Sequence, residues 1–111
     1  MPNTFLRKLS RNVGVTPTTV GSYTVDSNTQ TTLIGLTCAN LTTTAVTADI
    51  VLNTSADSDY HIVKDATVPA GSSLVAVGGD QKVVMQLGDS IKVTSSDSDS
   101  IDVIMSLLEI T

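Results

Sequence analysis

The stretch Ala45–Asn53, AVTADIVLN, alternates between apolar side chains and a second set that is mostly polar. A period of two residues indicates a β-strand with one buried face. The face expected to be buried holds Val46, Ala48, Ile50 and Leu52, and the opposite face holds Thr47, Asp49, Val51 and Asn53. This stretch therefore predicts a strand that covers one side of a core.

Similar short segments, rich in β-branched residues, follow one another along most of the chain. Turn chemistry separates them: a Pro and a Gly in VPAGSS, a Gly pair in VGGDQK and a Gly-Asp step in LGDS. The pattern predicts an all-β protein, an antiparallel β-sandwich or closed barrel of about seven to eight short strands. The segments are GSYTVD, TTLIGLTCAN, DYHIVK, SLVAVGG, KVVMQL, SIKVTSS and IDVIMSLLEI.

Two of these segments allow their faces to be assigned. In TTLIGLTCAN, one face is expected to hold Ile34, Leu36 and Cys38, and the other Leu33, Gly35 and Thr37. In the last segment, Ile101, Val103, Met105 and Leu107 share one face, while Ile104, Leu108 and Ile110 make the other apolar as well. Two apolar faces indicate a central strand or one covered by a neighbouring subunit.

The last two segments, SIKVTSS and IDVIMSLLEI, flank a Ser/Asp-rich stretch. We expect them to form a hairpin whose turn is too polar to bury.

Composition limits the class of protein. A chain of 111 residues suits a single domain, and one Cys cannot form an intramolecular disulfide. A net charge of −5 and an aromatic content of 3% argue against nucleic-acid binding, which relies on phosphate attraction and stacking. No apolar run approaches the roughly 20 residues that span a bilayer. We therefore expect a soluble protein made in a cytoplasm, with neither nucleic acid nor membrane as a partner.

The N-terminal stretch FLRKLSR, Phe5–Arg11, stands apart from this acidic composition. It holds three of the six Lys and Arg residues and the single Phe. The Gly/Pro/Thr-rich segment NVGVTPTTVG follows it and is typical of an extended linker. These features predict an arm and linker over residues 1–19 and a β-sandwich domain over residues 20–111, with a short helix face formed by Phe5, Leu6, Leu9 and Val13.

Bulky apolar side chains are rare in disordered tails, so we expect the arm to be covered. Burial of each such side chain is worth roughly 1.5–3 kcal/mol. The hypothesis is that the arm docks on another subunit and that deleting residues 1–13 leaves the sandwich folded but unattached. The predicted partner-binding residues are Phe5, Leu6, Arg7, Lys8, Leu9 and Arg11.

The sequence gives little support for a catalytic or metal-binding site. His61 is the only histidine, no G-x-S-x-G nucleophile elbow is present, and Cys38 lies at a strand position that suits a small buried hydrophobe. The acidic segments NTSADSDY and SDSDSIDV offer oxygen ligands for calcium but lack the Gly and Glu positions of an EF-hand. We therefore predict a non-enzyme without catalytic, cofactor-binding or metal residues and without a cofactor.

The segments NTFLRKLSRNVG, TTVGSYTV, TQTTLIGLT, VGGDQKVV, LGDSIKVTSS and DVIMSLLEIT together resemble small virion structural proteins of tailed bacteriophages. The likeness is greatest to those of phages that infect marine cyanobacteria, and it runs from Asn3 to Thr111. It implies a β-sandwich particle component without enzymatic activity, located in the virion. Such proteins include head decoration (cement) proteins and neck or tail components.

The function expected is a capsid decoration protein attached to the head through its N-terminal arm. Its partners would be the major capsid protein or other virion proteins, and copies of itself in a homo-oligomer, for which a trimer about a three-fold axis is one arrangement. A neck or tail component is the alternative within the same class. A glycan-binding or adhesion module is the alternative from another class, since sandwiches host many lectins.

Overall fold

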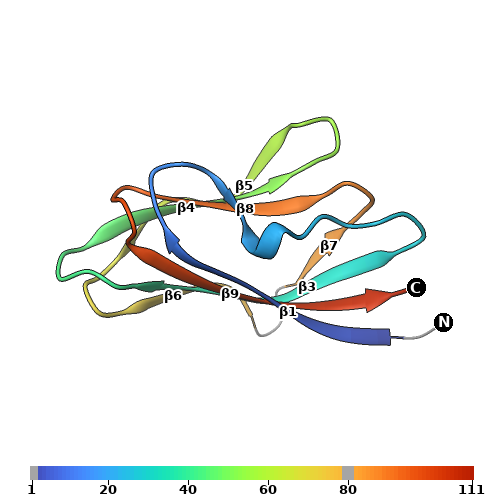
Figure 1. The fold of residues 1–111 in the computed structure, drawn as a ribbon, viewed down its shortest axis with the longest axis horizontal. Coiled ribbons are helices and arrows are strands. Elements are labelled where there is room, and N and C mark those ends of the chain that lie inside the picture. The colour runs from blue at the N-terminus through green and yellow to red at the C-terminus, as the bar shows by residue number, and fades with distance from the viewer. Residues whose placement is uncertain (1–2, 79–81) are drawn as a thin grey trace.

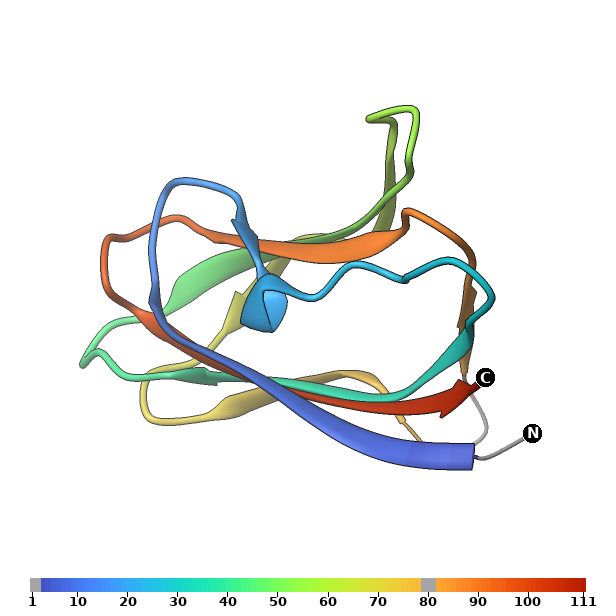
Figure 2. The ribbon, with the colours of Figure 1, turned by 45° about the vertical axis from the view of Figure 1, so that its right-hand side comes forward.

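The computed structural model describes residues 3–78 and 82–111. Two antiparallel sheets pack face to face (Figures 1 and 2), so the predicted all-β sandwich is confirmed and the barrel alternative is not adopted. The described residues form nine strands and one short 3-10 turn. They are β1 (Asn3–Val13), β2 (Thr18–Thr19), η1 (Val20–Ser22), β3 (Gln30–Asn40), β4 (Val46–Asn53), β5 (Asp59–Val68), β6 (Ser73–Val77), β7 (Val83–Met85), β8 (Ser90–Ser95) and β9 (Ile101–Ile110).

The strands divide into two sheets, called here sheet A and sheet B. Sheet A has the order β1-β9-β3-β6, and β7 also pairs with β3. Sheet B has the order β2-β8-β4-β5. β9 therefore lies between β1 and β3, which confirms the central position that its two apolar faces predicted.

The core fills the space between the sheets. Ile101, Val103, Met105 and Leu107 on β9 are all buried, as their shared face predicted. On β4, Val46, Ala48 and Ile50 are buried and Leu52 packs against the core, as the alternation in AVTADIVLN predicted, but Val51 and Asn53 on the opposite face are buried as well. Val25, Leu36, Met85, Ile91 and Val93 are among the other core residues.

The expected faces of β3 are wrong in its first half. Leu33 is fully buried with Leu36 and Cys38, while Ile34 is only partly buried. The register against β9 shifts between Leu33 and Gly35, so Ile34 is an extra residue on this strand. A β-bulge of this kind moves the residues before it to the opposite face from the one that strict alternation predicts.

The predicted hairpin of the last two strands is also wrong. β8 pairs with β2 and β4 in sheet B, whereas β9 pairs with β1 and β3 in sheet A. The Ser/Asp-rich connection therefore crosses between the sheets, and Ser100 within it is fully buried. Its hydroxyl bonds Ser95 and donates to the carbonyl of Asp97 at 2.8 Å, which satisfies its polar atom. The predicted Gly-pair turn involves residues 79–81, which lie outside the described residues.

The N-terminal region differs most from its prediction. Residues 3–13 form an edge strand of sheet A instead of a helix, and Thr18–Thr19 pair with β8 in sheet B. The boundary expected after residue 19 therefore falls inside the sandwich. Pairing with β9 supplies backbone hydrogen bonds that span most of β1, whereas a helix this short is marginal in water.

Candidate docking surface

The outer face of sheet A carries two apolar rows that run across its strands. Residues paired side by side in a sheet point to the same face, so the strand registers assign these rows. In the first row, Phe5 pairs with Leu108, Leu108 with Thr32, and Thr32 with Val84. In the second row, Leu9 pairs with Ile104, Ile104 with Thr37, and Thr37 with Val75. Together the rows cover the sheet from one edge to the other.

Five of the six large apolar side chains in these rows are exposed, and Leu108 is partly buried. Phe5 is 73% exposed, Val84 67%, Val75 66%, Ile104 53% and Leu9 51%. The largest apolar patch of an ordinary monomer covers roughly 300–600 Å² and is often functional. A two-row patch across a whole sheet is therefore a candidate docking surface, and we call it the sheet A face.

The outer face of sheet B has a different character. The register pairs Thr47 with Thr67, Asp49 with Thr94, and Val51 with Lys92, and these residues alternate with the core-facing ones. This side of the sandwich is rich in hydroxyl and charged groups. The outer face of sheet A is therefore more apolar than the outer face of sheet B.

The six predicted partner-binding residues divide between the two sides of β1. Phe5, Arg7, Leu9 and Arg11 are exposed on the sheet A face, because successive side chains of a strand alternate. Leu6 packs against the core instead, and the Nζ of Lys8 lies 5.5 Å from the centre of the Tyr23 ring. The structure therefore brings four of the six together on one surface and places Leu6 and Lys8 elsewhere.

β1 is tied to η1 beneath it. The backbone N–H of Gly21 donates to Ser10 Oγ at 2.9 Å, and Lys8 covers the Tyr23 ring. The Tyr23 hydroxyl donates to Glu109 Oε2 at 2.6 Å and bonds Thr31 Oγ1 at 2.8 Å. Burial, followed by the hydrogen bond to Glu109, raises the pKa of Tyr23 to about 12. These contacts hold β1 against its own sandwich.

The cations of β1 have a second physical role. β1 lies at the edge of sheet A, and among the described residues no strand pairs with the other side of its backbone. Charged side chains on an edge discourage unwanted pairing with other chains. Arg7 and Arg11 therefore also discourage another chain from pairing with the free edge of β1.

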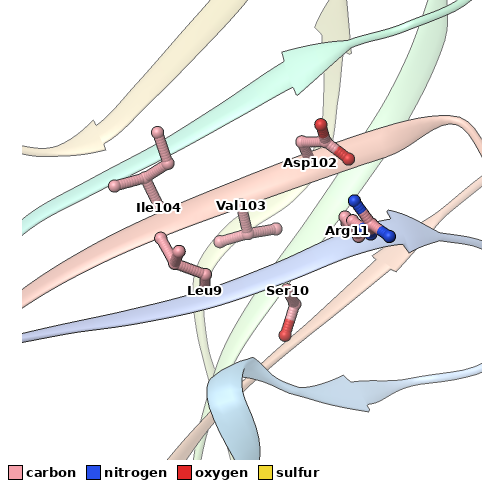
Figure 3. Close-up of a pocket in the computed structure, with 6 residues that line it drawn as sticks. All are labelled: Leu9, Ser10, Arg11, Asp102, Val103 and Ile104. Atoms are coloured by element: carbon pink, nitrogen blue, oxygen red, sulfur yellow. The ribbon is translucent and has the colours of Figure 1, made fainter.

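A hollow lies on the sheet A face between β1 and β9 (Figure 3). Its volume is about 480 Å³, and it is open to solvent. Leu9 and Ile104 lie side by side at one end, with Arg11 and Asp102 at the other (Figure 3). Ser10 points away from them toward η1, in agreement with its bond to Gly21. The hollow thus has apolar side chains at one end and a guanidinium and a carboxylate at the other.

Sequence reasoning missed two members of this surface, Val75 and Val84. Alternation in SLVAV contained the signal, because Val75 falls opposite Leu74 and Ala76, which pack against the core. Ile104 was recognised as an outward apolar residue. What the sequence alone did not reveal is that β6, β7 and β9 share one sheet with β1.

The other candidate residues are distributed as follows. His61 is exposed on β5, and Cys38 is fully buried on β3, which confirms its assignment as a small buried hydrophobe. Within residues 3–78 and 82–111, no group of three or more His, Cys, Asp or Glu side chains is arranged to hold a metal ion. In the same part of the chain, no helix has the length and apolar character needed to span a bilayer.

The buried thiol predicts a loss of stability at alkaline pH. Burial raises the pKa of Cys38 from 9.0 to about 11. The unfolded chain releases this proton first, so the stabilisation is fully present below about pH 9 and is lost as the pH rises to about 11. A shift of two pKa units corresponds to roughly 3 kcal/mol. Urea unfolding between pH 8 and 10, below the range in which Tyr23 adds a loss of its own, should show this decline, and Cys38→Ala should flatten it there; an unchanged slope in the variant would contradict the assignment.

Comparison with known proteins shows the fold alone. No family model and no curated protein matches this chain. A chain from Bacillus endospore appendages, a family of disulfide-linked pili, is similar with a TM-score of 0.59 and 12% identity, over 99% of this chain and 87% of that chain. A chain of infectious bursal disease virus, Gx strain, has a TM-score of 0.53 and 14% identity, over 97% of this chain but 32% of its own. The protein thus shares its sandwich with a pilus chain and with part of a viral chain.

Proposed function

We propose that this is a non-enzymatic structural protein of a virion, a capsid decoration (cement) protein of a tailed bacteriophage that attaches through the sheet A face. The observation that carries the proposal is the contrast between the two outer faces, one with exposed apolar rows and one polar. A monomeric domain rarely exposes so much apolar surface, whereas a subunit bound to a capsid lattice buries it. The major capsid protein is the proposed partner.

The structural neighbours support a role in assembly. One comes from a pilus and the other from a virus, and both share the sandwich over nearly the whole of this chain. The pili are disulfide-linked, but the single Cys38 of this chain is fully buried. We therefore infer that attachment here is non-covalent.

Two side chains of the sheet A face have a physical role in the proposed attachment. Phe5 contributes burial worth roughly 1.5–3 kcal/mol. Arg7 selects a partner surface that presents carboxylates, since a guanidinium group pairs with a carboxylate in two-pronged hydrogen bonds. Many such contacts on one particle add through multivalency.

The number of copies in purified virions tests the proposal. Mass spectrometry against the major capsid protein should give copies in the hundreds, the order expected of a lattice-bound protein. About a dozen copies would move the protein to the neck or tail. Absence from the particle, together with a specific hit on a glycan array, would favour an adhesion module instead.

A double variant on β1 tests the surface itself. Phe5→Ser with Arg7→Glu should reduce occupancy on particles by at least about tenfold, because it removes an apolar anchor and reverses a charge. Both side chains are exposed, so the melting temperature should change little. The matched control is Leu41→Ser, which removes a half-exposed apolar side chain outside the sheet A face. Equal occupancy of the double variant and the control would refute attachment through this face.

A further inference from the structure

We propose that copies of this chain also associate head to tail, with the β4–β5 hairpin of one copy seated in the β1–β9 hollow of the next. The inference rests on the proposed function in treating the sheet A face as a docking surface. The inference adds to the proposed function that a second copy of the chain occupies one end of that face.

The projecting element is the end of the β4–β5 hairpin. It extends beyond the two packed sheets (Figures 1 and 2). Tyr60, on the first part of β5, is 62% exposed. Asn53 Nδ2 donates to Asp57 Oδ1 at 3.1 Å and to Asp59 Oδ1 at 2.7 Å, which orients both carboxylates beside the ring-bearing strand. The hairpin thus presents an aromatic side chain flanked by negative charge.

The receiving element offers the complementary chemistry. Leu9 and Ile104, both more than half exposed, lie at one end of the hollow, and Arg11 and Asp102 lie at the other. A volume of about 480 Å³ is enough for an aromatic ring. Seating Tyr60 there would cover apolar area on both copies and bring Asp57 or Asp59 to Arg11.

Charge selects this arrangement over a symmetric one. Among the described residues of the sheet A face, the charged groups are Arg7, Arg11 and Asp102, a net charge of +1 on a chain of −5. If two such faces packed with β1 over β1, the arginines of the two copies would oppose each other. If β1 packed over β6 and β7, the outward residues described there would be Ser73, Val75 and Val84, and none of these three is acidic. The hairpin carries two carboxylates, Asp57 and Asp59, whereas the described residues of the sheet A face carry one, Asp102, so the hairpin offers the arginines more negative charge than a second sheet A face does.

An interface between two different patches has a structural consequence. A head-to-tail pair keeps a free hairpin on one copy and a free hollow on the other, so the association continues to a third copy. It closes into a ring where the rotation between copies allows and otherwise extends as a row.

The test uses the purified full chain in sedimentation equilibrium. The wild-type protein should show association that grows with concentration up to about 1 mM. Tyr60→Ser and Leu9→Asp should each weaken it by roughly tenfold or more, as expected for an interface anchor. Val84→Ser, which removes an equally exposed side chain at the far end of the same face, should leave it unchanged.

Mixing the two defective variants gives the sharpest result. The Leu9→Asp protein keeps an intact hairpin, and the Tyr60→Ser protein keeps an intact hollow, so their mixture should form a one-to-one dimer and stop there. A wild-type protein that stays monomeric to about 1 mM, or a mixture that stays monomeric, would overturn the inference. So would a loss in Val84→Ser equal to that in Leu9→Asp, which would indicate face-to-face packing.

The outcomes separate the inference from the proposed function. Particle occupancy that depends on Phe5 and Arg7, without association in solution, overturns head-to-tail contact alone. Association in solution by a protein that is absent from virions overturns the decoration role alone.

Discussion

Replacing Asn40 by Asp is expected to lower the free energy of unfolding by about 3–5 kcal/mol at neutral pH, because it leaves an uncompensated buried charge. Asn40 is only 4% exposed at the end of β3. Its Nδ2 donates to the carbonyl oxygens of Thr44 at 2.8 Å, Val68 at 2.9 Å and Pro69 at 3.3 Å. A carboxylate has no hydrogen to donate, so the variant would direct a negative charge at three carbonyl oxygens.

The other half of the Asn40 side chain explains why a carboxylate still fits sterically. Its Oδ1 accepts from the N–H and the hydroxyl of Thr42, both at 2.8 Å, and an Asp oxygen would keep these bonds. The loss of stability therefore comes only from the hydrogen bonds that Asn40 Nδ2 donates. It should shrink as the pH falls toward about 4, where the carboxyl takes up a proton and regains one donor.

Urea unfolding at pH 7 and pH 4 measures both effects. Asn28→Asp is the matched control, since Asn28 is exposed in a turn, where Asp is equally well accommodated. The control should change stability by no more than about 0.5 kcal/mol. If the free energy of unfolding fell equally in the two variants, the hydrogen bonds donated by Asn40 Nδ2 would not contribute to stability.

The second large effect is expected at Gly21. Gly21 has φ +59, and a Cβ built there would lie 2.7 Å from Lys8 Cβ and 3.2 Å from the backbone nitrogen of Leu9. Gly21→Ala should therefore strain the backbone and push η1 away from β1. A loss of about 2–4 kcal/mol combines left-handed strain with overpacking.

Gly71 provides the control for this variant. Its φ of +65 is nearly the same, but a Cβ there meets nothing within 4 Å. Gly71→Ala should therefore cost only the backbone strain, about 1–2 kcal/mol. The difference between the two variants in thermal unfolding isolates the contact with β1. Equal losses of stability in the two variants would show that η1 and β1 are not tightly packed at Gly21.

The contacts of β1 also revise the deletion experiment that the sequence suggested. Nine residues of β1 are paired with β9, and Val13 is buried in the core. Removing residues 1–13 would expose one side of β9, so we expect it to destabilise the sandwich. Loss of attachment after that deletion would not distinguish unfolding from a missing surface, whereas point variants on the outer side of β1 do.

Local patterning predicted most of the strands because alternation is a local property. The faces of β4 and β9 followed from it directly. The bulge at Ile34 did not, because an inserted residue leaves no mark on composition and depends on the register with β9. β1 was misassigned because Phe5 and Leu9 also suit a helical spacing, and only the distant partner strand decides between the two.

The sheet A face could be predicted only in part for the same reason. The unusual charge and bulk of FLRKLSR drew attention to the segment, but the alternation of a strand decides that Arg7 faces outward and Lys8 inward. Val75 and Val84 join Phe5 and Leu9 only through sheet pairing. A surface assembled from five strands is a property of topology, and a linear pattern does not contain it.

The pairing of β1 with β9 also has a consequence for biosynthesis. The register joins Asn3 to Ile110, so the earliest strand to leave the ribosome is completed by the latest. Sheet A cannot close until β9 has emerged, because β9 separates β1 from β3. During that wait, Phe5 and Leu9 are exposed on an unpaired segment, which is the condition that promotes aggregation. Three cations lie among these apolar residues, and charges placed in this way generally limit the aggregation of an exposed apolar segment.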